Sequence, residues 1–172
     1  LPEGYAEERM LSYSPEWFEE MAEAVELAME EIGPEIDQCT IIVNGGTLPG
    51  RDKGARVHIQ VLEAIRKRLG SLPKMVAIRA VLEPPLDEEW LYALREAGFT
   101  SLKMDVDVYD EEERKKVMPN AKGFRPLKDY EQAFKKAREI FPGEVGTQLV
   151  MGIHGIQSDE TLLRGVEHFA SL

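Results

Sequence analysis

Short apolar runs alternate along this chain with longer stretches in which apolar residues recur every three or four positions. Four apolar runs predict β-strands, at Cys39–Val43, Met75–Leu82, within Phe99–Val108, and at Val145–Gly152. The stretches between them have the period of amphipathic helices. Because strands that alternate with helices form right-handed βαβ units, the sequence predicts an α/β protein with a parallel sheet.

Capping residues predict where these helices begin and end. Ser14 followed by Pro15 is typical of a helix start, and Gly33 of the end of that helix. A short helix over Asp110–Val117 has its acidic residues first and its basic residues last, as the helix dipole favours. The other helix boundaries are predicted at Gly70, Asp87, Gly98 and Ser158.

Two closures of the sheet are compatible with this pattern, an open parallel sheet or an arc of a (β/α) barrel. We favour the partial TIM-barrel arc, because polar residues gather on one face of the strands. We expect residues 1–172 to form a single domain. The chain starts at Leu1 rather than Met and stops at Leu172 as a helix finishes, so we expect it to be part of a longer protein.

The first predicted strand ends on Asn44-Gly45-Gly46-Thr47. Ligands bind at the carboxyl ends of strands in α/β folds. Glycines lack a Cβ and let a ligand approach the main chain closely. The alternative is a plain turn between strand and helix, which glycine pairs often mark.

Side-chain alternation places charged residues from the later strands on the same face as Asn44. This face carries Arg79, Glu83, Lys103, Asp105, Asp107, Gln148, Gly152 and His154. The alternative is a barrel interior whose charges only pair with each other, such as Arg79 with Asp105.

The three histidines do not predict a metal site. His154 could act as a general base or a metal ligand, but no second histidine or carboxylate stands at ligand spacing. His58 and His168 fall on helices, and we expect both at the surface.

Composition and net charge limit the kinds of partner that the chain is expected to bind. The chain has 172 residues with a formal net charge of −11, which argues against a nucleic acid held by phosphate contacts. No apolar run reaches the roughly 20 residues of a membrane span, and no signal peptide is visible. We expect a cytoplasmic protein that binds a small molecule. The single cysteine, Cys39, cannot form a disulfide framework or hold a cluster alone.

From Ser14 onward, the order and the sequences of these segments resemble the middle part of the partial barrel of the radical SAM enzymes. The resemblance is to the biotin-synthase-like subgroup in particular. Asn44–Thr47 is similar to the Gly-Gly motif whose backbone binds the methionyl amino group of S-adenosylmethionine. Asp87–Gly98 is similar to the helix before strand four.

Two later motifs add to the resemblance. Met104–Asp110, with Arg114 and Pro119, resembles the strand-four signature. Asp107 stands where the family has a cofactor-contacting Glu, and its side chain is one methylene shorter. Val150–Ile156 resembles the strand-five glycine motif beside the adenine, which would put Gly152 there.

The resemblance implies an enzyme that cleaves S-adenosylmethionine reductively to a 5′-deoxyadenosyl radical, with an electron donor. Its iron–sulfur [4Fe–4S] cluster would need cysteines outside these residues, because the family's three-cysteine motif is absent. The cofactor-binding residues implied are Asn44, Gly45, Gly46, Thr47, Asp107 and Gly152. The substrate-facing candidates are Arg79, Glu83, Lys103, Asp105, Gln148 and His154.

Two rival functions remain open. One is a cluster-free binding protein or scaffold that kept the barrel arc. The other is a barrel aldolase that forms a Schiff base on Lys103. No catalytic residue and no metal ligand is assigned from the sequence.

Overall fold

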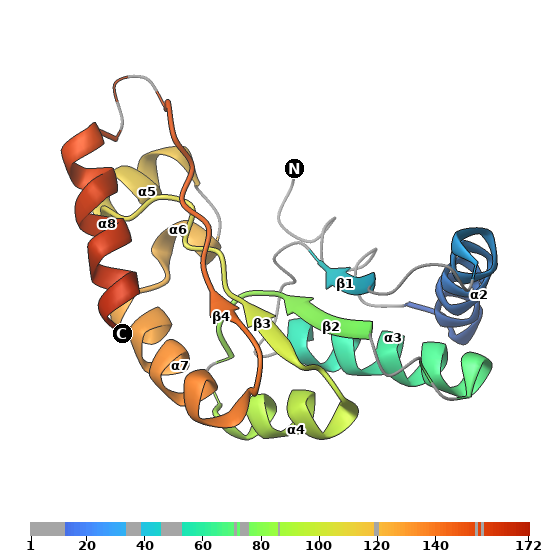
Figure 1. Cartoon of the computed structure of the whole chain (residues 1–172). Coiled ribbons are helices and arrows are strands. Elements are labelled where there is room, and N and C mark those ends of the chain that lie inside the picture. Colours follow the sequence, from blue (N-terminus) through green and yellow to red (C-terminus); the bar gives the residue numbers. More distant parts are fainter. Residues whose placement is uncertain are drawn as a thin grey trace.

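A computed structural model describes residues 13–33, 39–45, 53–70, 72, 76–85, 87–118, 121–153, 155 and 157–172 (Figure 1). Strands and helices alternate as predicted. The elements are α2 (Pro15–Ile32), β1 (Cys39–Asn44), α3 (Lys53–Leu69), β2 (Val76–Val81), α4 (Glu89–Ala97), β3 (Ser101–Lys103), α5 (Glu111–Val117), α6 (Ala121–Phe124), α7 (Leu127–Ile140), β4 (Val145–Gly146) and α8 (Asp159–Ser171).

The predicted caps close the helix ends. Ser14 Oγ accepts the Trp17 N–H at 3.4 Å, and Ser158 Oγ accepts the Thr161 N–H at 3.2 Å. Each cap satisfies backbone donors that have no partner inside the helix.

The four strands form one parallel sheet in the order β1-β2-β3-β4. Each strand lies beside its neighbour in sequence, so the order never reverses as it does in a doubly wound open sheet. A sheet wound in one direction is an arc of a (β/α) barrel, and this confirms the predicted fold class. Asn44 pairs with Val81, and Val81 with Lys103, which puts the ends of β1, β2 and β3 level.

The third and fourth strands are shorter than the sequence predicts. Beyond Lys103, the Val106 N–H donates to the side chain of Thr147 at 3.1 Å instead of to a carbonyl of the neighbouring strand. The two segments nevertheless stay together, because Asp107 N–H donates to Gln148 O at 2.9 Å and Val150 N–H to Asp107 O at 2.8 Å. Side-chain alternation therefore continues past the end of the regular ladder.

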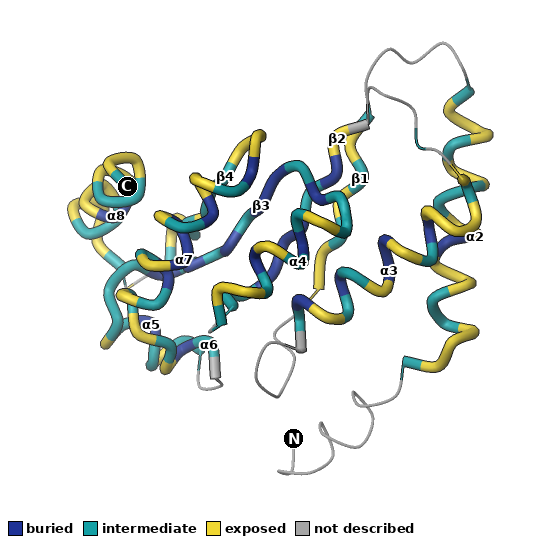
Figure 2. Tube along the Cα trace, turned by 90° about the horizontal axis from the view of Figure 1, so that it is seen from below, coloured by how far each residue is buried: buried dark blue, intermediate teal, exposed yellow. Residues whose placement is uncertain are grey.

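Helices cover one face of the sheet. In Figure 1, α3 and α4 lie below β1–β3, and Figure 2, seen from below, shows α3, α4 and α7 in front of the strands. The core between these layers includes Leu62, Ile78, Ala80, Leu94, Phe99, Leu102, Met104, Val106 and Phe134. Helix α2 packs against α3 through a smaller cluster around Ala22, Val61 and Ile65. Within the described residues, no helix combines the length and apolar character needed to cross a bilayer.

Candidate functional site at the carboxyl ends of the strands

A pocket of about 160 Å³ lies where β1, β2 and β3 end. It is lined by Asn44, Gly45, Val81, Leu82, Glu83, Asp105, Asp107 and Lys122. Five of these were candidates from the sequence alone: Asn44, Gly45, Glu83, Asp105 and Asp107. The structure therefore brings these five predicted residues to one place, and adds Lys122.

Gly45 forms one wall of this pocket. A Cβ on this residue would lie 3.2 Å from the Cε1 atom of His58, which is tighter than ordinary van der Waals contact. The Gly45 N–H donates to the Val81 carbonyl at 3.4 Å and so links the ends of β1 and β2. A larger residue here would require the buried ring of His58 to shift, so glycine suits this close approach. Gly46 and Thr47 lie outside the described residues.

Asp107 has an unusual backbone. Its φ is 61°, and among the described residues it is the one non-glycine residue with positive φ. Such a conformation costs on the order of 1–2 kcal/mol and persists where the surroundings enforce it, often at functional sites. Here the hydrogen bonds to Gln148 and Val150 hold the backbone, and the carboxylate forms an ion pair with Lys122 of α6. Asp107 and Lys122 are 18% and 22% exposed.

Glu83 is held by Arg125. Arg125 Nη2 lies 3.5 Å from Glu83 Oε2, and Arg125 Nη1 donates to the Pro84 carbonyl at 2.9 Å. Lys122 and Arg125 both come from the segment that contains α6. No sequence pattern pointed to either residue, because their role depends on how that segment folds over the strand ends.

Further along the same face of the sheet, Arg79 does not pair with Asp105, which was the alternative drawn from the sequence. Arg79 forms an ion pair with Glu144, not with Asp105. Lys103 Nζ donates to Gln148 Oε1 at 2.7 Å and lies 3.6 Å from Asp105 Oδ1. That Asp105 oxygen is buried without a hydrogen bond. Arg79, Lys103 and Gln148 thus share the polar face but do not line the pocket.

Gly152 does not line the pocket either. It follows β4 with φ 77° and comes two residues after Val150, whose N–H reaches the Asp107 carbonyl. His154 lies outside the described residues.

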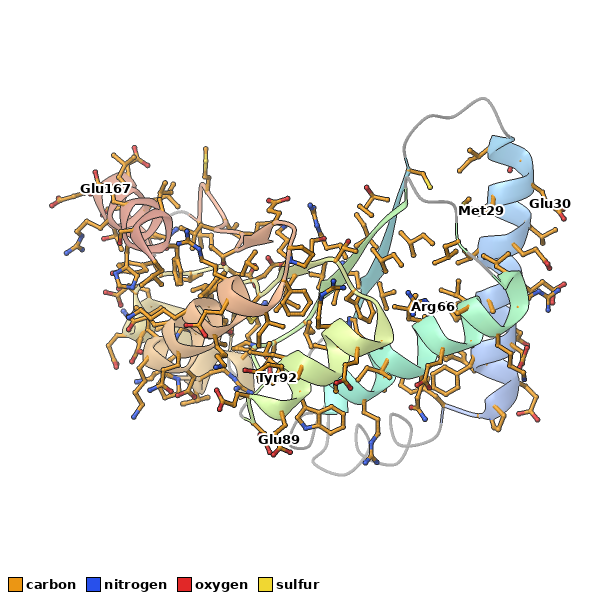
Figure 3. All side chains as sticks on the ribbon, turned by 60° about the horizontal axis from the view of Figure 1, so that its bottom comes forward. Met29, Glu30, Arg66, Glu89, Tyr92 and Glu167 are labelled. Carbon is orange, nitrogen blue, oxygen red and sulfur yellow. The ribbon has the colours of Figure 1, made fainter. Side chains whose placement is uncertain are left out.

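Cys39 lies at the other end of β1 from the pocket. Its sulfur is 4.0 Å from the Met29 sulfur of α2, and Figure 3 shows Met29 on the side of α2 that faces the sheet. One thiol at the amino end of a strand cannot hold a [4Fe–4S] cluster beside the strand carboxyl ends. Among the described residues, no group of three or more His, Cys, Asp or Glu side chains is placed to hold a metal ion.

His58 corrects the expectation of a surface position, because it is 2% exposed and points from α3 to the end of β2. The His168 side chain is partly exposed, at 29%, and its Nε2 lies 2.9 Å from Glu131 Oε1 between α8 and α7.

No family model matches the chain, and no curated protein matches it significantly.

The charges of the pocket define what it can bind. Its lining carries three carboxylates, Glu83, Asp105 and Asp107, and one ammonium, Lys122. Each carboxylate has a cation beside it: Arg125 beside Glu83, Lys103 beside Asp105 and Lys122 beside Asp107. Backbone polar groups at Gly45 supply further contacts. The arrangement suits a small polar ligand whose charged groups share or replace these ion pairs.

Proposed function

We propose that this chain is the S-adenosylmethionine-binding core of a radical SAM enzyme, and that the cofactor binds in the pocket at the carboxyl ends of β1–β3. The observation that carries the proposal is the convergence of Gly45 and Asp107 on one pocket. The resemblance assigns both positions to the cofactor, and they are 62 residues apart in the sequence.

The chemistry of the pocket supports the same ligand. S-adenosylmethionine carries a sulfonium and an ammonium, and carboxylates favour both. Asn44 and the Gly45 backbone would receive the methionyl amino group, and Asp107 would contact a polar group of the cofactor. Lys122 neutralises Asp107 in the described structure, so the ligand would share or replace that ion pair.

A [4Fe–4S] cluster does not fit the residues of this chain, because three thiolates are needed and the chain has one cysteine. We therefore derive no radical step here. The part assigned to this chain is to bind and orient the cofactor and to exclude water from it. The polar face around Arg79, Lys103 and Gln148 would meet a small-molecule substrate.

Calorimetry tests the binding step. We expect S-adenosylmethionine to bind more tightly than S-adenosylhomocysteine, by about tenfold, because the latter lacks the sulfonium charge and a charge-assisted contact is worth about 1.4 kcal/mol or more. Gly45→Val should weaken S-adenosylmethionine by at least about tenfold, since the added side chain presses on His58 or fills the pocket.

The matched control is Gly146→Ala in β4, where the nearest atom to the new Cβ is 3.4 Å away and the pocket is not involved. Equal affinity in the native chain and in Gly45→Val would reject the role of the glycine turn. Absence of any binding at millimolar cofactor would reject the proposal.

A cluster-free binding protein is the second candidate, and the position of Cys39 far from the pocket favours it. Iron analysis of the full-length protein after anaerobic reconstitution separates the two functions. About four irons per chain would support the radical enzyme, and none would support the cluster-free protein. The aldolase gains no support, since the observed partners of Lys103 are the Gln148 amide and the Asp105 carboxylate, whereas Schiff-base lysines are activated by an apolar pocket or a neighbouring cation.

A further inference from the structure

His58 makes two polar contacts from a buried position. Its Nδ1 lies 2.7 Å from the Gly54 carbonyl oxygen, and its Nε2 lies 3.0 Å from the Val81 carbonyl oxygen. Carbonyl oxygens only accept, so each ring nitrogen needs a proton to make a hydrogen bond there, and a neutral imidazole carries one N–H. Burial lowers the pKa of His58, and this outweighs the opposing effect of the nearby carbonyls of Gly54, Val81 and Val43. Burial thus favours the neutral ring, in which one of the two contacts has no proton.

The two carbonyls differ in their need for this single proton. Gly54 O lies one helical turn before His58 in α3 and already accepts the backbone N–H of that turn. Val81 O ends β2 and receives the Gly45 N–H at 3.4 Å, which is a long bond. His58 Nε2 lies 3.0 Å from Val81 O, so it is closer to this oxygen than the Gly45 N–H is. The neutral ring is better placed with its proton on Nε2.

The ring also lies beside Gly45. A Cβ on Gly45 would stand 3.2 Å from His58 Cε1, so the ring fills the space that a side chain at this pocket residue would need. On its other side the ring lies 6.4 Å from that of Phe99, in the core. His58 thus connects the core to the pocket through one carbonyl and one van der Waals surface.

We propose that His58 is a positioning residue of the pocket: its Nε2–H holds the Val81 carbonyl that also receives the Gly45 N–H, and its ring supports the Gly45 turn. This inference rests on the proposed function for the identity of the ligand. The contacts of the ring do not depend on that identity.

Two conservative variants of His58 distinguish a role in positioning the Val81 carbonyl from a role in filling space. The amide nitrogen of Gln can take the place of Nε2, and that of Asn the place of Nδ1. His58→Gln keeps a donor for Val81, whereas His58→Asn keeps one only for Gly54. We expect His58→Gln to retain the Gly45 amide chemical shift and to bind S-adenosylmethionine within about threefold of the native chain. His58→Asn should shift the Gly45 amide and weaken binding about tenfold, as expected for loss of one buried hydrogen bond.

The outcome that overturns the inference is equal behaviour of the Gln and Asn variants in both the Gly45 amide shift and the affinity. If neither variant folds, the imidazole nitrogen shifts of His58 in the native chain decide. A proton on Nε2 supports the inference, and a proton on Nδ1 overturns it. If S-adenosylmethionine does not bind the native chain while the Nε2 proton and the Gln–Asn difference in the amide shift are found, only the proposed function fails.

Discussion

Replacing Arg114 by Met should separate the strand ends from the segment that covers them. Arg114 on α5 is fully buried. Its Nη1 donates to the Val108 carbonyl at 3.0 Å and its Nη2 to the Arg125 carbonyl at 2.6 Å, and its guanidinium carbon lies 5.7 Å from the centre of the Tyr130 ring. One side chain therefore ties the chain after β3 to the segment that carries Lys122 and Arg125.

The expected cost follows from these contacts. Met fills similar space but leaves the buried carbonyl of Val108 and the partly buried carbonyl of Arg125 without this donor, at about 1–3 kcal/mol each. The contact with Tyr130 contributes a further 1–2 kcal/mol or so. Removing a buried cation returns part of this, because a charge no longer has to be desolvated. We expect Arg114→Met to lower the free energy of unfolding by about 2–4 kcal/mol.

Urea unfolding followed by circular dichroism measures this change. The control is Arg164→Met on the exposed face of α8, for which we expect a change of less than about 0.5 kcal/mol. The affinity for S-adenosylmethionine should fall as well, since the segment with Lys122 loses its attachment. If Arg114→Met costs no more than Arg164→Met, the two carbonyls find other donors and the reasoning is wrong.

Three further perturbations test other parts of the structure. Gly123→Ala would bring a Cβ within 1.7 Å of the Met118 carbonyl oxygen, so we expect a loss of about 2 kcal/mol or more in urea unfolding, against little change for Gly146→Ala. Asp107→Asn keeps a residue that tolerates positive φ but removes the charge, so the free energy of unfolding should change by less than about 1 kcal/mol. The affinity for S-adenosylmethionine, measured by calorimetry, should fall about tenfold. An unchanged affinity would argue against a contact between Asp107 and the cofactor. For His58, the unfolded chain binds a proton near pH 6.5 and the folded chain resists it. As the pH falls below 6.5, the free energy of unfolding of the native chain should therefore decrease by up to about 1.4 kcal/mol per pH unit more than that of His58→Gln. If the free energies of unfolding of the two proteins change in parallel with pH, the lowered pKa is contradicted.

The sequence predicts which face of a strand is polar better than it predicts which charges meet. From Leu102 to Val108 the buried and partly exposed residues alternate even where the regular ladder has ended, so Lys103, Asp105 and Asp107 do share a face. Their partners depend on the placement of later segments. Glu144 before β4 reaches Arg79, and α6 brings Lys122 to Asp107, which no local pattern encodes.

The burial of His58, in contrast, could be predicted from the sequence. Val61, Leu62 and Ile65 follow it by three, four and seven residues, which places His58 on the apolar stripe of α3. All three are buried in the structure. A histidine on such a stripe must find polar partners inside the protein, and here the partners are backbone carbonyls. Its helical location alone led to the wrong expectation of a surface position.

The same apolar residues that build the core also determine the chemistry of the pocket. Met104, Val106 and Val108 have no exposed surface, and each stabilises the fold by about 1.5–3 kcal/mol through burial. A slip of one residue in this segment would turn them toward the pocket and turn Asp105 and Asp107 toward the helices. The cost of exposing three apolar side chains and burying two carboxylates excludes that arrangement. The face on which Asp105 and Asp107 lie is therefore determined by the apolar residues that alternate with them, and the ion pairs then orient the carboxylates.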